Sequence, residues 1–259
     1  MSLVVSDAVV LHAFDYLESS RIYRLITRDA GVRSALARGA RRSSRRFGSA
    51  LDLFAQGTAQ LHVKSGRDLD TLAAFDVVRA RPELGADLGR FTGASVIAEL
   101  TLRFARDDAD PDLFAAVVNA LDALSAAGSG DAHEAAVAGA WQVIAALGLA
   151  PNVDSCSECG TPVPPEETVL FSHPAGGVLC TSCARLAAAG RRLPQSARDA
   201  LRRWMSGGHV KPLSHPEARS HLRLLREFVR EHLADERPLR AFQAWERTVW
   251  NGDAVEAAP

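Results

Sequence analysis

Residues 58–77 read TAQLHVKSGRDLDTLAAFDV, and their alternating pattern decides the fold of the first third of the chain. Ala59, Leu61 and Val63 alternate with polar residues, which predicts a half-buried strand with one face in solvent. A second strand follows directly along the chain. The residues expected on one side of this second strand are Leu69, Thr71, Ala73, Phe75 and Val77.

Three further strands are predicted upstream, over Asp7–Phe14, Arg21–Thr27 and Val32–Arg38. They are rich in Val, Ile, Leu and Tyr and are bounded by turn residues such as Asp15. Five short strands in succession, with no helical pattern between them, indicate a small closed sheet such as a Greek-key barrel. We therefore expect residues 1–80 to form one barrel domain.

The segment between the third and fourth strands, residues 37–48, reads ARGARRSSRRFG and contains no acid. Serine and glycine between its arginines remove any helical or strand period, so the segment is predicted to be a loop. Loops on a rigid scaffold often carry function, and this one would suit a polyanion. The alternative is a solvated basic loop without a ligand. Its arginines are Arg38, Arg41, Arg42, Arg45 and Arg46.

A helical period begins at Pro82. The first long helix is apolar on most sides and should be buried on several of them. The next begins at Asp110 and Pro111, because aspartate caps a helix and proline suits its first turn. Residues expected to share one face of the first long helix are Leu88, Phe91, Ser95, Ala98 and Leu102.

Four more helices are predicted, over residues 132–147, 195–205, 216–233 and 238–250. The helical domain therefore has a first part, residues 81–150, and a second part, residues 191–250. Residues 251–259 are expected to be a flexible tail. The whole chain is predicted to be an α+β multidomain protein.

Four cysteines interrupt the helical domain within residues 151–190. Cys156 and Cys159 form one C-x2-C pair and Cys180 and Cys183 another, a spacing that can place four thiolates on one tetrahedral zinc ion. Four sulfur ligands leave no position for water, so we expect one structural Zn2+ rather than a catalytic one.

The residues between the two cysteine pairs are expected to form a hairpin, as in a zinc ribbon. Its strands would be Thr168–Ser172 and Gly176–Leu179. His173 could replace a ligand, but an exposed histidine of the hairpin is the preferred interpretation.

The remaining patterns exclude several classes of protein. No P-loop, G-x-S-x-G, H-E-x-x-H or G-x-G-x-x-G motif is present, and no nucleophile and base can be paired, so we expect no enzyme activity. Neither a run of about 18 apolar residues nor a signal peptide is found. A cytosolic protein is therefore expected, in which cysteines more often bind metal than form disulfides.

The formal net charge of −1 hides a segregation of charge. Residues 1–80 carry 12 basic and 8 acidic side chains, whereas residues 81–155 carry 4 and 11. Within the acidic part, the run of aspartates over residues 107–112 could bind a divalent cation, but helix capping and a solvated loop are the preferred interpretation.

Two helices in the second half of the chain carry stripes of arginine. Glu227 and Glu231 alternate with the second stripe, so ordinary i,i+4 ion pairing is the default interpretation. The alternative is a site for an acidic peptide. The stripes are Arg198 and Arg202 on one helix, and Arg219, Arg223, Arg226 and Arg230 on the next.

Several of these motifs together resemble a known family. The motifs are Glu18-Ser19-Ser20, residues 27–31 (TRDAG), residues 37–42 (ARGARR) and residues 51–54 (LDLF), followed by helices around a four-cysteine module. This combination resembles the bacterial RecO recombination mediators over nearly the whole chain. The stretch 37–42 is the most specific part, and the helical half matches in order and length more than in residues.

The resemblance implies an N-terminal OB-fold, a helical domain and an embedded zinc module. It also implies a non-enzymatic role in DNA repair: binding single- and double-stranded DNA, annealing complementary strands, and helping RecA load onto DNA coated by single-strand-binding protein. RecR is the implied partner, RecF a further one, and the acidic C-terminal tail of single-strand-binding protein the implied peptide. The implied location is cytoplasmic, at the nucleoid during repair.

The residues of the barrel are themselves consistent with binding of single-stranded DNA. OB-fold proteins bind single strands with basic grooves and stacking aromatic rings. Arg21, Lys64 and Arg67 could extend the basic surface of the loop, and Tyr23 or Phe47 could offer a ring. Phe47 could equally anchor the loop, and Tyr23 could lie in the core. A second hypothesis is a zinc-ribbon adaptor whose barrel binds protein or RNA without annealing.

Overall fold

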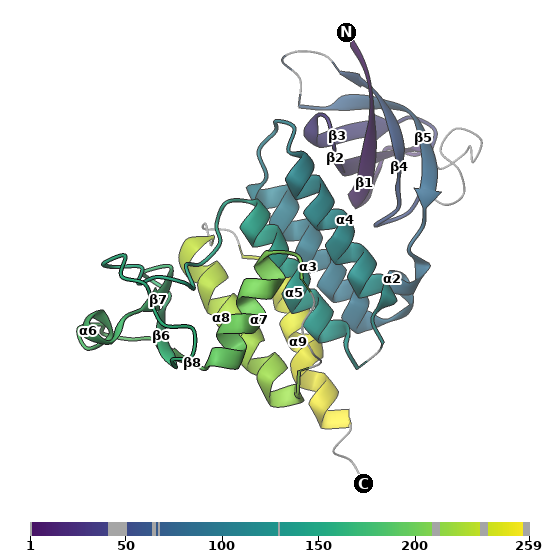
Figure 1. Cartoon of the computed structure of the whole chain (residues 1–259). Helices are drawn as coiled ribbons and strands as arrows, with labels where there is room; N and C mark the ends of the chain where they lie inside the picture. Colours follow the sequence, from purple (N-terminus) through teal and green to yellow (C-terminus); the bar gives the residue numbers. More distant parts are fainter. Residues whose placement is uncertain are drawn as a thin grey trace.

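The computed structural model describes residues 2–40, 51–63, 66, 68–128, 130–208, 213–233 and 238–255. An N-terminal barrel and a small module of short strands lie at opposite ends of a helical bundle (Figure 1). This arrangement confirms the predicted α+β multidomain fold, with a five-stranded OB-like barrel, a helical domain and a four-cysteine module.

Five strands close the barrel in the order β1-β2-β3-β5-β4. Residues Ala35 and Leu36 of β3 pair in parallel with Asp70 and Thr71 of β5, whereas the other neighbours are antiparallel. The strands are β1 (Ser2–Tyr16), β2 (Ser20–Thr27), β3 (Gly31–Ala37), β4 (Gln56–Val63) and β5 (Asp70–Arg79).

Strand β1 is longer than the predicted Asp7–Phe14 because it serves two partners. Residues 2–9 pair with β4, and residues 8–16 pair with β2. A register shift between Val10 and His12 marks an irregularity in the ladder, and such bulges bend a strand. The bend lets one strand belong to both sides of the barrel.

The predicted inward face of β5 is wrong in its first half. Leu72 and Phe75 are the side chains buried in the barrel core, not Thr71 and Ala73. The register of β4 and β5 shifts between Gln60 and the next residue. One extra residue on a strand exchanges its two faces, and nothing in the alternation of residues revealed the shift.

The turn between β2 and β3 packs against the loop before α4. Gly31 has φ +68°, which favours glycine, and a Cβ at this position would clash with the backbone oxygen of Asp108. Asp110 begins α4 (Pro111–Ala126), and its carboxylate accepts a hydrogen bond from Leu113 N at 2.9 Å. Helix capping by the aspartate run is thus confirmed at Asp110.

Helix α3 (Leu88–Phe104) is buried on several sides, as predicted, but the expected face is wrong. Leu88 is 65% exposed and Phe91 37% exposed. Gly93 and Ala94 are buried instead, and a Cβ on Gly93 would lie 2.7 Å from Ala136 Cβ on α5. Small residues let α3 and α5 approach closely. The buried face of α3 is therefore identified by its small residues and not by its largest side chains.

The bundle also contains α2 (Pro82–Ala86), α5 (Ala132–Ala146), α7 (Gln195–Met205), α8 (His215–His232) and α9 (Arg240–Val255). Trp141 on α5 and Trp245 on α9 are fully buried, and the Trp141 ring lies 5.2 Å from that of Phe228 on α8. Both parts of the helical domain therefore share one core. Helix α9 continues to Val255, past the expected start of the tail at residue 251.

A buried arginine joins the barrel to the bundle. Arg81 has no exposed side-chain surface, and its Nε lies 2.7 Å from Asp122 Oδ1 on α4. The same guanidinium donates to Phe54 O at 2.6 Å and to Gln56 Oε1 at 2.9 Å. Arg79 donates to the other oxygen of Asp122 at 2.5 Å. These contacts fix the end of β5 and the start of β4 against α4.

Replacing Arg81 with methionine should lower the free energy of unfolding by roughly 3–5 kcal/mol, because buried acceptors lose their donors. Urea unfolding followed by circular dichroism measures this loss. Arg79→Met is the matched control: its side chain is 52% exposed, so it should cost about 1 kcal/mol or less. Equal losses in the two variants would contradict the role assigned to Arg81.

Candidate nucleic-acid surface and metal centre

The four cysteines meet at one point of the small module. Their sulfur atoms all lie within 4.8 Å of one another, and Cys159 Sγ is 3.8 Å from Cys180 Sγ. Ligand sulfurs about 2.3 Å from a tetrahedral zinc ion lie about 3.8 Å apart. The geometry and the donor set therefore fit one metal ion with four thiolate ligands: Cys156, Cys159, Cys180 and Cys183.

Tight turns bring each pair of cysteines together. Gly160, at φ +73°, donates its N–H to Cys156 O at 2.8 Å. The second pair lies at the start of α6 (Thr181–Ala184), where Ala184 N donates to Cys180 O at 2.9 Å. Between the pairs, β6 (Val169–Ser172) and β7 (Gly177–Leu179) form the predicted hairpin. The additional strand β8 (Arg191–Leu193) pairs with β6.

The thiols have unequal proton affinities. Burial raises the pKa of Cys156, but hydrogen bonds from the backbone of Cys180, Cys159 and Glu158 outweigh it and bring the pKa to about 6. Hydrogen bonds with the sulfurs of Cys180, Cys159 and Cys156 raise the pKa of Cys183 to about 12. A metal ion would displace the remaining protons, so metal binding should weaken as pH falls.

Arg198 attaches this module to helix α7. Its side chain is buried, and its guanidinium donates to Val153 O at 2.5 Å, Pro164 O at 2.5 Å and Val163 O at 2.8 Å. Its donors are directed at the loop before and after the first cysteine pair. Arg198 is therefore removed from the set proposed to bind an acidic peptide, because it is inaccessible to a ligand.

His173 is not the exposed histidine that we expected. Its ring is half-buried beside Phe171, and its Nε2 lies 2.9 Å from Glu227 Oε2 on α8. Burial lowers the pKa of His173, while the Glu227 carboxylate opposes this effect. Arg191 of β8 also donates to both oxygens of Glu227. The carboxylate of Glu227 on α8 thus contacts both the hairpin, through His173, and β8, through Arg191.

Two of the predicted DNA-binding arginines are described. Arg38 follows the end of β3 and is exposed. Arg21 on β2 is 41% exposed at its side chain, and its Nε lies 2.8 Å from Asp15 Oδ1. Tyr23, one of the two candidate stacking rings, is 2% exposed and belongs to the barrel core. Its role in stacking is therefore excluded.

The other residues predicted to contact DNA lie outside the described residues. They are Arg41, Arg42, Arg45, Arg46, Lys64, Arg67 and the aromatic Phe47.

Two arginines of the stripes, Arg202 and Arg226, make ion pairs, but not the expected i,i+4 pairs with Glu227 and Glu231, because Glu227 is occupied by Arg191 and His173. Arg202 contacts Asp154 at 2.7 Å and Asp199 at 2.6 Å, and Arg226 Nε lies 3.4 Å from Glu246 on α9. Arg223 and Arg230 are exposed. The structure therefore leaves Arg223 and Arg230 of these stripes most accessible, while Arg219 is half-buried.

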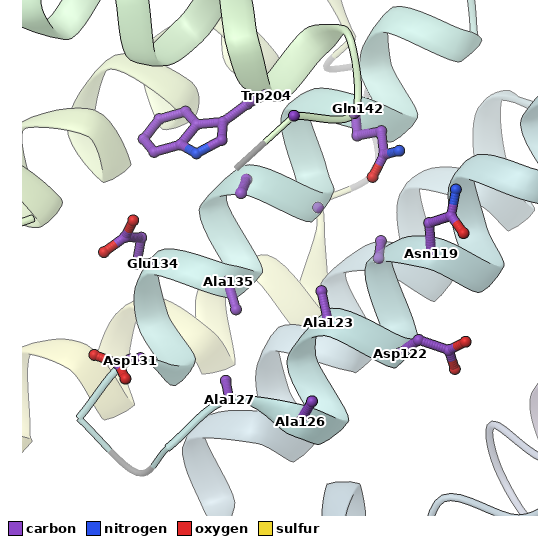
Figure 2. A pocket seen from close by; sticks show the side chains of 15 residues that line it. Asn119, Asp122, Ala123, Ala126, Ala127, Asp131, Glu134, Ala135, Gln142 and Trp204 are labelled. Atoms are coloured by element: carbon purple, nitrogen blue, oxygen red, sulfur yellow. The ribbon is translucent and has the colours of Figure 1, made fainter. Parts of the chain in front are cut away.

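Two of the cavities lie between helices of the bundle, the first lined by carboxylates such as Asp131 and Glu134, the second by arginines together with one carboxylate, Glu217. The first, about 680 Å³, runs between α4, α5 and the end of α7. Figure 2 shows its lining: alanines such as Ala123 and Ala135, with Asp131 and Glu134 toward one end. Burial raises the pKa of Glu134, which accepts a hydrogen bond from Leu213 N at 2.9 Å. An acidic ligand does not suit this cavity.

The second cavity, about 520 Å³, lies between β8, the start of α7 and α8. Arg192 and Arg223 line it together with apolar residues, including Leu193 and Leu224. Sequence analysis missed Arg192. The pair Arg191-Arg192 between Gly190 and Leu193 was visible in the sequence, but only the pairing of β8 with β6 places it opposite α8.

Comparison with known proteins finds the same family in both halves of the chain. The profile described as "Recombination protein O N terminal" matches residues 1–81, and "Recombination protein O C terminal" matches residues 85–241. Within the described residues, no helix has the length and apolar composition needed to span a membrane.

Relatives named "DNA repair protein RecO" cover most of the chain. The protein of Anaeromyxobacter sp. (strain K) is 40% identical over 250 residues, which are 93% of this chain and 96% of the relative. That of Myxococcus xanthus is 34% identical over 230 residues, 88% and 91% of the two chains. That of Geobacter sulfurreducens is 36% identical over 183 residues, 70% and 73% of the two chains.

Purified protein should contain about one divalent metal ion per chain, measured by elemental analysis and native mass spectrometry. Changing Cys159 to serine should abolish tight binding of the ion, because one of four thiolates is lost. Ser182→Ala, an exposed position between Cys180 and Cys183, is the matched control and should retain the metal. Full metal content in the Cys159→Ser variant would contradict this site.

Proposed function

The chain belongs to the RecO family of DNA repair proteins, and from this premise we propose that it acts as a recombination mediator. In this role it binds single- and double-stranded DNA, anneals complementary strands, and with RecR helps load RecA onto DNA coated by single-strand-binding protein. The matches of this chain to both the N-terminal and the C-terminal family profile carry this proposal. The role needs no reaction centre, and its place is the cytoplasm, at the nucleoid.

DNA binding is assigned to the barrel. The exposed Arg38 opens the basic stretch 37–48, which contains five arginines and no acid. Arginine binds phosphate with a planar pair of donors, and each neutralised phosphate releases counterions. Two complementary strands whose phosphates are neutralised on neighbouring surfaces repel each other less, so they anneal without chemistry by the protein.

The metal ion is assigned as zinc. Four cysteine thiolates at tetrahedral spacing are a donor set typical of structural Zn2+. Zn2+ bound there would hold the loops 156–160 and 180–184 together, and Arg198 would transmit that order to α7. The proposed role of the ion is folding of the module, with no step in DNA binding.

The acidic tail of single-strand-binding protein is assigned to the second cavity. Arg192 and Arg223 offer cations at its rim, and Leu193, Pro194 and Leu224 offer an apolar lining. A peptide with carboxylates beside apolar side chains matches both features. RecR and RecF are proposed partners on family membership alone, and no residues are assigned to them.

Changing Arg41, Arg42, Arg45 and Arg46 to alanine should abolish annealing of complementary oligonucleotides at moderate salt. If all five arginines of the loop contact phosphate, the plot of log affinity for single strands against log salt should have a slope of about −3.5 for the parent. The variant lacks four of these contacts, so its slope should be shallower by about 2.8. The matched control changes Arg185, Arg203, Arg230 and Arg247, exposed arginines of the second half, to alanine.

The control variant should retain annealing and salt slope despite the same change in net charge. If neither parent nor variant shifts single-stranded DNA at low salt, the mediator role is excluded and the chain is better described as an adaptor for protein or RNA.

Changing Arg192 and Arg223 to alanine should weaken binding of an acidic tail peptide by about tenfold or more, since hydrogen bonds to charged groups contribute roughly 1.5–3 kcal/mol each. Fluorescence anisotropy of a labelled peptide measures the affinity. The double variant Arg203→Ala/Arg247→Ala, at exposed positions outside this cavity, removes the same two charges and is the control. Unchanged affinity in the double variant would exclude the second cavity as the peptide site.

A further inference from the structure

The outer face of β1, β2 and β3 is only partly covered by the helical bundle. Val9 and Leu11 on β1 and Ile26 on β2 belong to the same core cluster as α3. Arg24 Nη2 donates to Leu102 O near the end of α3 at 3.2 Å. Beyond this point along β1, the side chains of the same face are no longer buried.

Two aromatic rings occupy the uncovered part. Phe14 is 43% exposed and Tyr16 is 41% exposed. They lie two residues apart on one strand, so both point to the same side of the sheet. The ring of His12 is 5.8 Å from that of Phe14 and continues the row.

Strand register places basic residues on the same face. His12 pairs with Arg24, Phe14 with Ile22, and Tyr16 with Ser20. On β3, Ala37 pairs with Arg21 as the last residue of the strand, and the exposed Arg38 follows it directly, at the end of the ladder where Ser20 begins β2. Asp15 projects from the opposite face, where Arg21 neutralises it.

The turn that follows these rings, Leu17-Glu18-Ser19, begins with an exposed apolar residue in a strained conformation. Leu17 has φ +53°, a backbone conformation that costs a leucine energy, and its side chain is 76% exposed. Neither the strained backbone nor the exposed side chain of Leu17 contributes to the core. Exposed rings beside a strained turn, on the same barrel as the exposed Arg38, indicate a surface that contacts a ligand.

We propose that Phe14 and Tyr16 form a stacking platform for the bases of single-stranded DNA, with Arg38 placing the phosphates. This inference rests on the proposed DNA binding and adds the residues that contact bases. Stacking on an aromatic ring tolerates any base, because every base has a π face, and it needs unpaired bases. The platform would therefore distinguish single strands from duplex, which the arginines alone cannot do.

A protein partner for the same rings is less well supported. The uncovered face ends in Arg24 and Arg38, and a polyanion with flat apolar groups matches both the charge and the rings. Leu3 and Val5 on the other half of β1 are also exposed, at 56% and 55%, but they pair with His62 and Gln60 of β4 and have no Phe, Tyr or Trp opposite them. They supply a matched control on the same strand.

The test compares the full-length parent with Phe14→Leu/Tyr16→Leu, which keeps apolar side chains but removes both rings. Leu3→Ala/Val5→Ala is the control variant. Affinity is measured by fluorescence anisotropy for an oligothymidine, for an abasic strand of equal length and for a duplex, each over a range of salt concentrations. Thermal unfolding and sedimentation velocity of every variant check the fold and the oligomeric state.

The ring variant should bind oligothymidine about tenfold more weakly or worse. Its salt slope should not change, because no phosphate contact is lost. Its affinity for duplex and for the abasic strand should equal that of the parent, and the control variant should behave as the parent throughout.

Four results would overturn the platform. Unchanged binding of oligothymidine would exclude stacking while leaving the proposed DNA binding intact. Equal losses for oligothymidine and the abasic strand would assign the effect to the backbone. If the ring variant has a different oligomeric state from the parent, the face would be assigned to self-association. A parent that binds no single strand at all would overturn the proposed function and the platform together.

Discussion

The guanidinium of Arg81 holds the barrel on the bundle, and the position of the proposed DNA-binding surface depends on it. A charge without exposed surface is stable only when its donors are satisfied. Here Asp122, Phe54 O and Gln56 satisfy them from α4, from the chain before β4 and from β4 itself. Because these contacts come from both domains, the barrel cannot rotate without leaving a buried charge unpaired.

Arg198 repeats the same principle at the other end of the bundle. Its three hydrogen bonds to backbone carbonyls order the chain on both sides of Cys156. Glu227 then connects α8 to Arg191 and His173 of the module. The module also shares an apolar core with the helices, through side chains such as Phe171 and Val178. The polar contacts add direction to that packing, and the proposed zinc ion would supply order around the cysteine loops themselves.

Much of this architecture was predictable because its signals are local. Alternation predicted the strands of the barrel, capping predicted the start of α4 at Asp110, and spacing predicted the four-cysteine cluster. What failed depends on contacts between distant residues. The register shift beside Gln60 exchanges the faces of β5, and Arg198 looks like any arginine on a helical stripe until its carbonyl partners, 34 to 45 residues away, are known.

The same reasoning explains why the sequence offered Tyr23, beside Phe47, as a stacking ring and did not single out Phe14 or Tyr16. Alternation assigns residues to two faces but does not say which face is the interior near the open end of a barrel. Tyr23 pairs with Ala13 and Ala35, both on the buried side, whereas Phe14 and Tyr16 lie on the other. The first part of the bundle, with 11 acids against 4 bases over residues 81–155, repels a polyanion over about 10 Å at roughly 0.1 M salt. The proposed DNA ligand is therefore directed away from α3, α4 and α5 and toward the barrel, to the face that we propose for stacking.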